Sequence, residues 1–458
     1  WSSDVCSSDL NARSGLIYSI APSPLDVNRI WFGTDDGQIH LTIDGGAHWA
    51  DVTPPALTPY MKIFNMDAGH FDAQTAYAAA NTLRLDDMRP HLFRTHDGGK
   101  TWTEIVNGLE GAGPTSTIRE DPKKKGLLFA GSERQVYVSF DDGDRWQSLR
   151  LNMAPSSVRD LTIHDDDLVA ATHGRGFWVL DDITPLRQID NSTANSDAVL
   201  FKPTTAWRVR WNTNTDTPIP VDEQTLQNPP EGVTLNYYLK AAANGPVTLE
   251  VFGADKRLVR RYSSTDPPAY DPNSGTLPSF WYRPLQKVST EPGLHRFTWD
   301  VHYQPIPPAS GGGPSTALGA GGRGGRGAGL PIAAVPFNTV PAPTTPWVNP
   351  GAYTVTLTVN GKSYSQPITV KQDPRVKTPA LTMQQVYSLT KAAYYGVIDA
   401  QEAAQKASGP AQAELNSAAA GLMGVMNSLT AADVQPTANQ LRAMNEALAR
   451  ARAALAKK

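Results

Sequence analysis

The N-terminal part of the chain alternates between short apolar runs and polar turns. The runs at 30–33 (IWFG), 127–131 (LLFAG) and 168–172 (LVAAT) are four or five residues long, with glycine, aspartate or other turn residues close by. Runs of this length between turn residues are typical of short β-strands rather than helices. We therefore expect this part of the chain to consist of many short strands joined by tight turns.

The same succession of strands and turns recurs at a regular distance. Asp44, Asp97 and Asp141 each lie in a Ser/Thr-x-Asp-x-Gly-x-x-Trp stretch, and the steps between them are 53 and 44 residues. A period of this size is typical of a four-stranded propeller blade. We call each of these stretches an Asp turn. A fourth unit follows without an Asp turn. The repeats predict a partial β-propeller of about four blades over residues 11–188.

The repeated turns are interpreted as scaffold, because an active site is rarely built three times along one chain. Glycine supplies a positive φ, the aspartate accepts backbone N–H groups, and the tryptophan begins the outer strand and packs across the blade face. A calcium or catalytic role is the alternative, but each aspartate lacks a second ligand at a helpful spacing. The residues expected to be structural are Asp44, Gly46, Trp49, Asp97, Gly99, Trp102, Asp141, Gly143 and Trp146.

These turns resemble the Asp-box (BNR) repeat of sialidases, xyloglucanase-like glycosidases and sortilin-type propellers. The stretch 168–188 (LVAATHGRGFWVLDDITPLRQ) resembles the last blade of large bacterial sortilin-like propeller proteins, which are often labelled glycosyl hydrolases. The resemblance implies the C-terminal part of an extracellular or periplasmic protein, with its remaining blades upstream. It is specific for the family and weak for activity, because one fold hosts many functions.

Candidate ligand-binding residues lie on the turns that join strands two and three of each unit. In a propeller these turns share the axial face opposite the Asp turns, where ligands usually bind. Mixed carboxylates and guanidinium groups suit a peptide or glycan ligand, although solvated turn residues in salt bridges are the alternative. The long turn 83–91 is the strongest candidate, since it exceeds what a hairpin requires. The candidates are Asp35, Asp36, Arg84, Asp86, Asp87, Arg89, Glu133, Arg134, His173 and Arg175.

Three functions stay open at this point. The first is a secreted binding module that recognises a peptide or glycan through the axial face. Another is a surface adhesion or assembly protein. The remaining one is a sialidase- or xyloglucanase-like glycoside hydrolase. Glycoside hydrolysis generally needs two carboxylates flanking the scissile bond, whereas a sialidase-like mechanism needs an arginine cluster and a tyrosine nucleophile. The pairs Asp35/Asp36 and Asp86/Asp87 could each supply one carboxylate, but no complete catalytic set can be assembled from this chain.

The pattern changes twice beyond the repeats. Residues 189–231 are expected to form a connector, and residues 232–372 alternate as in an Ig- or fibronectin-like β-sandwich. A Gly/Pro-rich insertion at 305–350 interrupts the sandwich and is expected to be disordered, because its composition cannot bury a core. Residues 373–458 follow a helical period and are expected to form three helices.

Composition excludes some classes of function. The 458-residue chain has a formal net charge of −3, so nothing points to nucleic acid, and no apolar run approaches the ~20 residues of a membrane helix. Its single cysteine, Cys6, lies in residues 1–10 (WSSDVCSSDL), which resemble a translated sequencing-adapter artefact. Without Cys6 the chain has no thiol for disulfide, metal or redox chemistry. We expect no metal and no cofactor.

Overall fold

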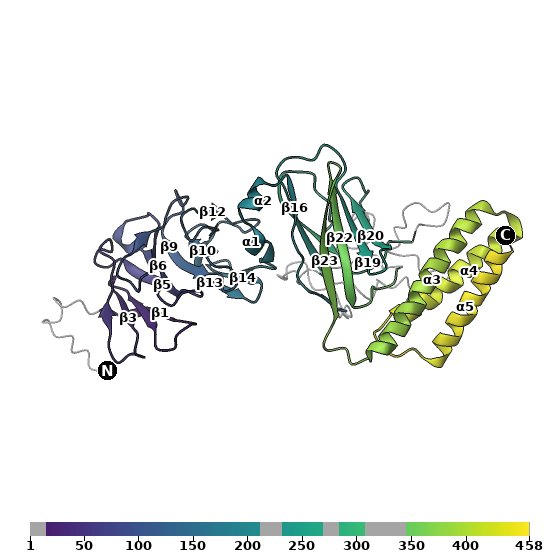
Figure 1. Ribbon diagram of the computed structural model, residues 1–458, viewed down its shortest axis with the longest axis horizontal. Coiled ribbons are helices and arrows are strands. Elements are labelled where there is room, and N and C mark those ends of the chain that lie inside the picture. Colours follow the sequence, from purple (N-terminus) through teal and green to yellow (C-terminus); the bar gives the residue numbers. More distant parts are fainter. Residues whose placement is uncertain (1–14, 211–230, 269–283, 307–344, 458) are drawn as a thin grey trace. The chain divides into compact units, whose positions relative to one another are not determined.

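The computed structural model describes residues 15–210, 231–268, 284–306 and 345–457 (Figure 1). The chain divides into two compact units, Trp1–Ser192 and Thr193–Lys458. In the described residues, four antiparallel sheets of three or four strands build the N-terminal unit, while a three-stranded sheet, a five-stranded sheet and three long helices build the C-terminal unit. The predicted fold class is confirmed: the chain is mainly β, with partial propeller, sandwich and C-terminal helical bundle in that order.

Each sheet of the N-terminal unit is one propeller blade, and its strands follow one another in sequence order. Blade 1 contains β1 (Ile17–Pro22), β2 (Ile30–Thr34), β3 (Ile39–Thr42) and β4 (Ala50–Asp51). Blade 2 contains β5 (Lys62–Ala68), β6 (Ala76–Asn81), β7 (His91–Thr95) and β8 (Thr103–Glu104). Blade 3 contains β9 (Thr115–Glu120), β10 (Leu128–Ser132), β11 (Val136–Ser139) and β12 (Gln147–Ser148). Blade 4 contains β13 (Ser157–His164), β14 (Asp167–His173) and β15 (Phe177–Leu180), followed by the short helices α1 (Thr184–Gln188) and α2 (Asn191–Asn195).

Consecutive blades pack face to face through apolar side chains in register. In blade 2, Met66 pairs with Ala78 and Ala78 with Phe93 across three strands. These residues share a buried cluster with Trp31 and Ile39 of blade 1. The first strands of neighbouring blades lie side by side, so β1, β5, β9 and β13 form the inner wall of the propeller.

The C-terminal unit contains two sheets and a helical bundle (Figure 1). The three-stranded sheet has the order β16-β18-β21, and the five-stranded sheet has the order β17-β23-β22-β19-β20. Their strands are β16 (Ala198–Leu200), β17 (Ala206–Arg208), β18 (Val233–Leu239), β19 (Thr248–Gly253), β20 (Leu258–Ser263), β21 (Gly293–Trp299), β22 (Gly351–Val359) and β23 (Lys362–Gln372). The helices are α3 (Ala380–Lys406), α4 (Gly409–Thr430) and α5 (Ala438–Ala456), the last one opened by a capping box between Thr437 and Gln440.

The structure differs from the sequence expectations at two places in this unit. The short strands β16 and β17 lie in the segment that was expected to be a connector, and they pair with β18 and β23. Trp347 and Val348 lie in the segment expected to be disordered, yet Val348 is fully buried and Trp347 packs on His302 at a ring-centroid distance of 4.1 Å. The rest of the Gly/Pro-rich insertion, residues 307–344, lies outside the described residues, as do residues 1–10.

A buried ion-pair cluster fastens the helices to the sandwich. Asp433, in the loop between α4 and α5, lies 2.6 Å from Nη2 of Arg208 and 2.9 Å from Nε of Arg210. Gln372 of β23 donates a further hydrogen bond to the same carboxylate at 3.1 Å. The side chains of Arg208 and Asp433 are only 5% and 6% exposed, so neither charge has water as a substitute partner.

Replacing Asp433 by alanine should lower the free energy of unfolding by about 3–5 kcal/mol, because two largely buried guanidinium groups lose their carboxylate. Urea unfolding followed by circular dichroism measures this loss. The matched control is Asp255→Ala, which removes a more exposed link to α3, the 3.2 Å pair with Lys391, and should cost less than about 1 kcal/mol. Equal losses in the two variants would contradict the assignment of Asp433 as the fastening point.

Candidate functional site

The Asp turns are held by a hydrogen-bond pattern that repeats in all three blades. Oδ1 of Asp97 accepts the Thr95 hydroxyl at 2.9 Å and the Thr101 backbone N–H at 2.9 Å. The Thr95 hydroxyl oxygen in turn accepts the N–H of Gly99 at 3.0 Å, which explains the Ser/Thr of the pattern. The hydroxyl and N–H of Thr101 lower the pKa of Asp97 to about 2. The same turn bonds recur at Asp44 and Asp141. These carboxylates are therefore occupied inside their own turns.

In blades 2 and 3, the glycine and the tryptophan of the Asp turn contact the blade that comes before. A Cβ atom on Gly99, which has φ +82°, would lie 2.7 Å from Cβ of Val52 in blade 1. The indole Nε1–H of Trp102 donates to the carbonyl oxygen of Val52 at 2.8 Å. In blade 3, the indole of Trp146 makes the same 2.8 Å bond to Ile105 of blade 2. The face that the tryptophan covers is thus the face of the preceding blade, and the turn is an inter-blade fastener.

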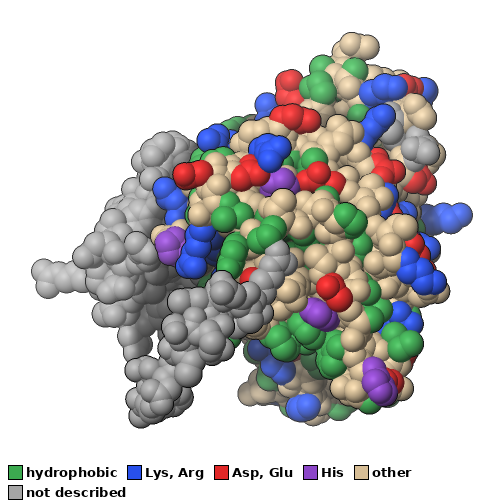
Figure 2. Space-filling view, turned by 90° about the vertical axis from the view of Figure 1, so that its left-hand side faces the viewer, with side chains coloured by type: hydrophobic (Ala, Val, Ile, Leu, Met, Phe, Trp, Pro, Cys, Tyr) green, Lys and Arg blue, Asp and Glu red, His purple; other side chains and the backbone are tan. Residues whose placement is uncertain are grey.

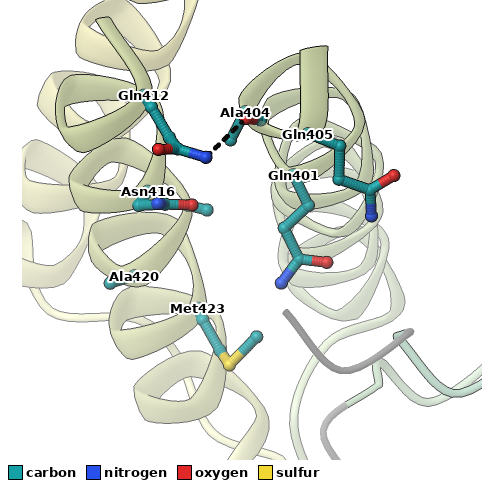
Figure 3. Close-up of a pocket in the computed structure, with 8 residues that line it drawn as sticks. Gln401, Ala404, Gln405, Gln412, Asn416, Ala420 and Met423 are labelled. Atoms are coloured by element: carbon teal, nitrogen blue, oxygen red, sulfur yellow. Dashed lines mark hydrogen bonds between the residues drawn. The ribbon is translucent and has the colours of Figure 1, made fainter. Parts of the chain in front are cut away.

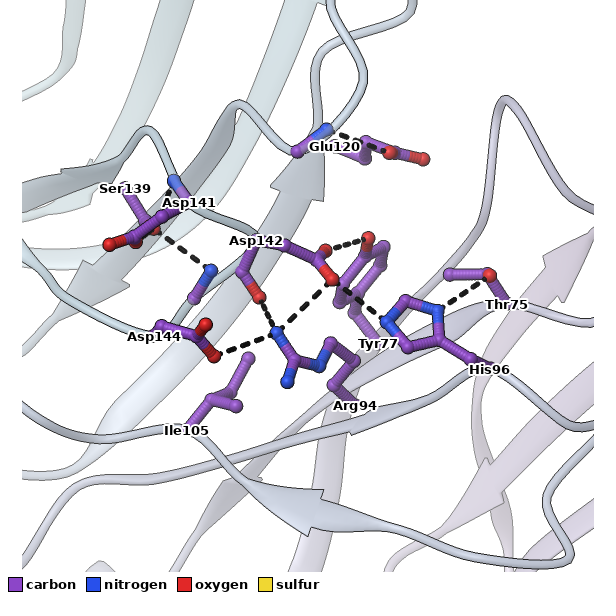
Figure 4. A network of polar contacts seen from close by, with 12 residues as sticks. Thr75, Tyr77, Arg94, His96, Ile105, Glu120, Ser139, Asp141, Asp142 and Asp144 are labelled. Carbon is purple, nitrogen blue, oxygen red and sulfur yellow. Dashed lines mark hydrogen bonds and ion pairs between the residues drawn. The ribbon is translucent and has the colours of Figure 1, made fainter. Parts of the chain in front are cut away.

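A polar network strengthens the same junction between blades 2 and 3 (Figure 4). Asp142, on the Asp turn of blade 3, accepts the Tyr77 hydroxyl at 2.6 Å and lies 2.8 Å from Nε2 of His96. Arg94 donates to both the side chain and the backbone carbonyl of Asp142. Burial, with the charge of Glu120, raises the pKa of the Tyr77 phenol, so this hydroxyl stays a donor. The network joins blades and leaves no free nucleophile at Asp142.

Trp146→Ala should lower the free energy of unfolding by about 3–5 kcal/mol, since it removes a buried indole and its inter-blade hydrogen bond. The matched control is Trp49→Ala, at the same position of blade 1, where the side chain is 41% exposed. That change should cost less than about 1.5 kcal/mol. Urea unfolding followed by circular dichroism measures both values, and equal costs would refute the inter-blade role.

Two of the candidate aspartates accept hydrogen bonds from neighbouring residues. Oδ1 of Asp35 accepts the backbone N–H of Leu16 at 2.8 Å. Asp36 is only 4% exposed and accepts the hydroxyl of Thr34. Neither side chain presents an open carboxylate pair to a ligand.

The long turn 83–91 carries both occupied and exposed groups. It opens with a single 3₁₀ turn, Leu83–Leu85, and then turns at Asp86, which has φ +55°. Asp87 takes two hydrogen bonds from the Arg89 guanidinium, at 2.9 and 2.7 Å, and this pairing holds the pKa of Asp87 well below its usual range. Arg84 and Asp86 are exposed. Within the described residues, Arg84 and Asp86 are thus open to a ligand without an ion-pair partner, whereas Arg89 is exposed but paired with Asp87.

The remaining candidates lie on the turns of blades 3 and 4. Glu133 forms an ion pair with Arg159 of β13 at 3.2 Å. Arg134, His173 and Arg175 are exposed. Across the described part of the chain, no ion pair joins candidate residues from two different turns. Of the candidate residues, Glu133 is joined to the inner wall through its ion pair with Arg159.

The inner wall carries a group of side chains that the sequence interpretation missed. Nζ of Lys62 lies 3.2 Å from the centre of the Tyr18 ring, and the Tyr18 and Phe64 rings are 5.3 Å apart. The guanidinium of Arg159 lies 6.0 Å from the Phe64 ring. We call Tyr18, Lys62, Phe64, Glu133 and Arg159 the axial patch. The signal in the sequence was a cation beside a buried residue in a first strand, as in Lys62–Ile63 and Val158–Arg159.

A second inner-wall group is structural. Nη1 of Arg119 donates to Asn65 Oδ1 at 3.0 Å in blade 2. Its Nε donates to the carbonyl of Leu161 at 2.8 Å and its Nη2 to Asp160 at 2.9 Å, both in blade 4. Arg119 therefore uses its N–H donors to join the first strands of blades 2, 3 and 4. Asp67 lies 3.7 Å away from this guanidinium.

Asp67 should make the stability of the N-terminal unit pH-dependent. Burial raises the pKa of Asp67 from 3.8 to about 6. Burial also raises the pKa of the neighbouring Glu120. A folded-state pKa above the unfolded value means that stability falls as pH rises from about 4 to about 6. Asp67→Asn keeps an oxygen acceptor for the Glu120 N–H but cannot ionise, so it should flatten this fall by about 1–2 kcal/mol.

Urea unfolding at pH 4, 5, 6 and 7 measures that slope. The control is Asp165→Asn on the exposed β13–β14 turn, which should keep the wild-type profile. Parallel profiles for wild type and Asp67→Asn would show that Asp67 is not the titrating group.

Two pockets lined by described residues of the C-terminal unit carry no histidine or cysteine. A pocket of about 270 Å³ lies between α3 and α4 (Figure 3) and is lined by amides, alanines and one methionine; Gln412 donates to the Ala404 carbonyl at 3.1 Å. A pocket of about 710 Å³ lies beside β20 and β21, where Arg261 faces Asp266 at 3.9 Å. In the described ranges, no group of three His, Cys, Asp or Glu side chains could hold a metal ion.

None of the described helices combines the length and hydrophobicity that a membrane crossing demands.

One segment of the propeller is similar in sequence to a known protein family. Residues 90–173 match the sequence model of the Sortilin-Vps10 family, described as sortilin, neurotensin receptor 3. This segment is sortilin-like. Vacuolar protein sorting/targeting protein 10 of Pyrenophora teres f. teres (strain 0-1) is 32% identical over 76 residues, which is 17% of this chain and 5% of the relative. Its counterpart in Phaeosphaeria nodorum is 26% identical over the same length. The chain thus spans about 5% of the length of these curated relatives.

Solved structures are similar at lower levels. YCF48 bound to D1 peptide has 19% identity and a TM-score of 0.30, covering 36% of this chain and 51% of that one. The GH74 xyloglucanase of Xanthomonas campestris has 12% identity and a TM-score of 0.31, covering 55% of this chain and 37% of that one.

Proposed function

We propose that the N-terminal unit is the ligand-binding part of a secreted, sortilin-like propeller protein and that it captures a polypeptide through the axial patch. The observation that carries the proposal is a pair of cations held over aromatic rings on the inner wall. The sequence match to Vps10 sorting proteins supports a binding or sorting module. An extracellular or periplasmic location and a bacterial origin stay predictions from the resemblance.

The chemistry of the axial patch favours an acidic segment. Among the described residues, the Lys62 ammonium makes no hydrogen bond or ion pair, so its three N–H donors remain for an anionic ligand group. Arg159 has one carboxylate partner, Glu133, and its five donors leave room for a second. Tyr18, which is 46% exposed, and Phe64 supply flat apolar surface beside these charges. A peptide with carboxylates next to an apolar side chain satisfies both features.

Hydrolysis is less well supported by the same face. A glycosidase of the xyloglucanase type needs two carboxylates open to one substrate. Asp35, Asp36 and Asp87 accept hydrogen bonds from neighbouring donors, and Asp44, Asp97 and Asp141 accept hydrogen bonds within their own Asp turns. We therefore put binding ahead of turnover.

Selection of random 12-residue peptides on the immobilised chain tests the proposal. Enriched peptides should be rich in Asp and Glu, and Lys62→Ala or Arg159→Ala should each weaken their binding about tenfold, the value of one charge-assisted contact. Affinity should also fall as salt is added. The matched controls are Arg84→Ala and Arg175→Ala, which remove exposed guanidinium groups outside the axial patch and should change affinity less than about twofold.

Two outcomes would contradict the proposal. Loss of binding in the two control variants alone would move the site to the turns. Capture of an acidic polysaccharide such as polygalacturonate, without any acidic peptide, would show that the ligand is a glycan.

A further inference from the structure

The ion-pair cluster between the helices and the sandwich contains more positive than negative charge. Arg208 and Arg210 both face the carboxylate of Asp433, at 2.6 and 2.9 Å. Among the described residues, no second carboxylate forms an ion pair with either guanidinium group. Both groups stay protonated, because a guanidinium does not lose its proton in proteins. The cluster therefore carries one uncompensated positive charge.

One N–H donor of this cluster is buried without an acceptor. Nη2 of Arg208 donates to Asp433 at 2.6 Å, and Nη1 donates to the side-chain oxygen of Gln372 at 3.1 Å. Nothing in the described structure accepts a hydrogen bond from Nε, although the Arg208 side chain is only 5% exposed. Buried polar groups are normally paired with protein or with a bound molecule. This donor thus needs an acceptor that the described residues do not supply.

The surroundings of Arg208 disfavour its charge even with Asp433 beside it. Burial lowers the pKa of Arg208, the charge of Asp433 raises it, and the charge of Arg210 lowers it again, with a lower pKa as the net result. A lowered pKa of a guanidinium means that the protein stabilises the charged form less than water does. Exposed charges differ, since water solvates them; Figure 2 shows Lys and Arg side chains interspersed with Asp and Glu on the face that it draws.

A small cavity adjoins the two guanidinium groups. Its volume is about 20 Å³, and both Arg208 and Arg210 line it. Trp347 forms another wall, with the guanidinium groups 5.3 and 4.9 Å from its ring centre. The hydroxyls of Thr390 and Thr430, also in the lining, donate to backbone carbonyls of their own helices. A cavity of this size holds one water molecule or one small ion, since a water needs at least about 10–15 Å³.

We propose that this cavity binds a single monovalent anion of the size of chloride, with the guanidinium groups of Arg208 and Arg210 as its donors. The anion provides the missing acceptor, and together with Asp433 it balances the charge of the two arginines. Water fits the same volume but adds no charge. Sulfate and phosphate, with five heavy atoms each, are too large.

The position of the cavity gives the anion a role in joining the helices to the sandwich. Its lining combines Arg208 of β17 with Met383 of α3 and Leu429 of α4. An ion bound only in the folded state stabilises that state in proportion to its occupancy. We therefore expect the packing of the helices on the sandwich to depend on halide concentration.

Urea unfolding of the full chain in chloride tests the proposal, with circular dichroism of the helices as the readout. Sodium chloride is raised while sodium gluconate, whose anion is too large for the cavity, is lowered, so that ionic strength and surface screening stay constant. Over a hundredfold rise in chloride the urea midpoint should increase by about 0.5–1 M, the shift that corresponds to a tenfold larger ratio of folded to unfolded chain.

Arg210→Gln removes the excess charge and leaves Arg208 and Asp433 as a balanced pair. In this variant chloride should move the urea midpoint by less than about 0.1 M, because the cavity no longer favours an anion. The matched control is Arg375→Gln in the same unit, which removes a guanidinium that is 76% exposed and pairs with Asp373 two residues away. The control should keep the full response to chloride.

A bromide soak of crystals of the native chain gives a second test that needs no variant. The anomalous signal should show one bromide ion in the cavity, in contact with Nε of Arg208. Each of three results would overturn the proposal. An unchanged urea midpoint in the native chain, or a cavity without bromide, would mean that water alone fills it. A full chloride response in Arg210→Gln would place the anion elsewhere.

Discussion

The junctions between blades 1 and 2 and between blades 2 and 3 depend on one contact, the hydrogen bond from an indole N–H to a backbone carbonyl of the preceding blade. A blade is a small sheet with two apolar faces, and it cannot bury both without neighbours on either side. The Asp turn holds the tryptophan at the correct angle, and the turn glycine lets the preceding blade approach within van der Waals distance. Aspartate, glycine and tryptophan recur together because all three serve this one junction.

This constraint also decides where ligand chemistry can lie. The Asp turns are occupied by scaffold bonds, so reactive or binding groups have to come from the inner wall or the opposite turns. On the inner wall, Arg119 is saturated by blades 2 and 4, whereas Lys62 and Arg159 keep free donors beside aromatic rings. The difference between a structural and a binding cation is thus how many of its donors the fold already uses.

The sequence was sufficient for the features that arise from local bonds. The repeat predicted the blades, because the bonds of each Asp turn join residues at most four positions apart. The axial patch was missed because Tyr18, Lys62 and Arg159 come from three different blades, and alternation shows which side a residue faces but not which residues meet. The strand β17 was missed because it has three residues and its parallel partner, Val370, lies far along the chain from Ala206. The candidate turns, and the proposed domain bounds, remain predictions.

The account is tested most directly by hydrogen exchange at the three turn tryptophans, measured by NMR of the indole Nε1–H groups. If the preceding blade supplies the acceptor, the indole protons of Trp102 and Trp146 exchange at least about tenfold more slowly than that of Trp49. Equal exchange at all three positions would mean that the tryptophans belong to their own turns and do not join the blades.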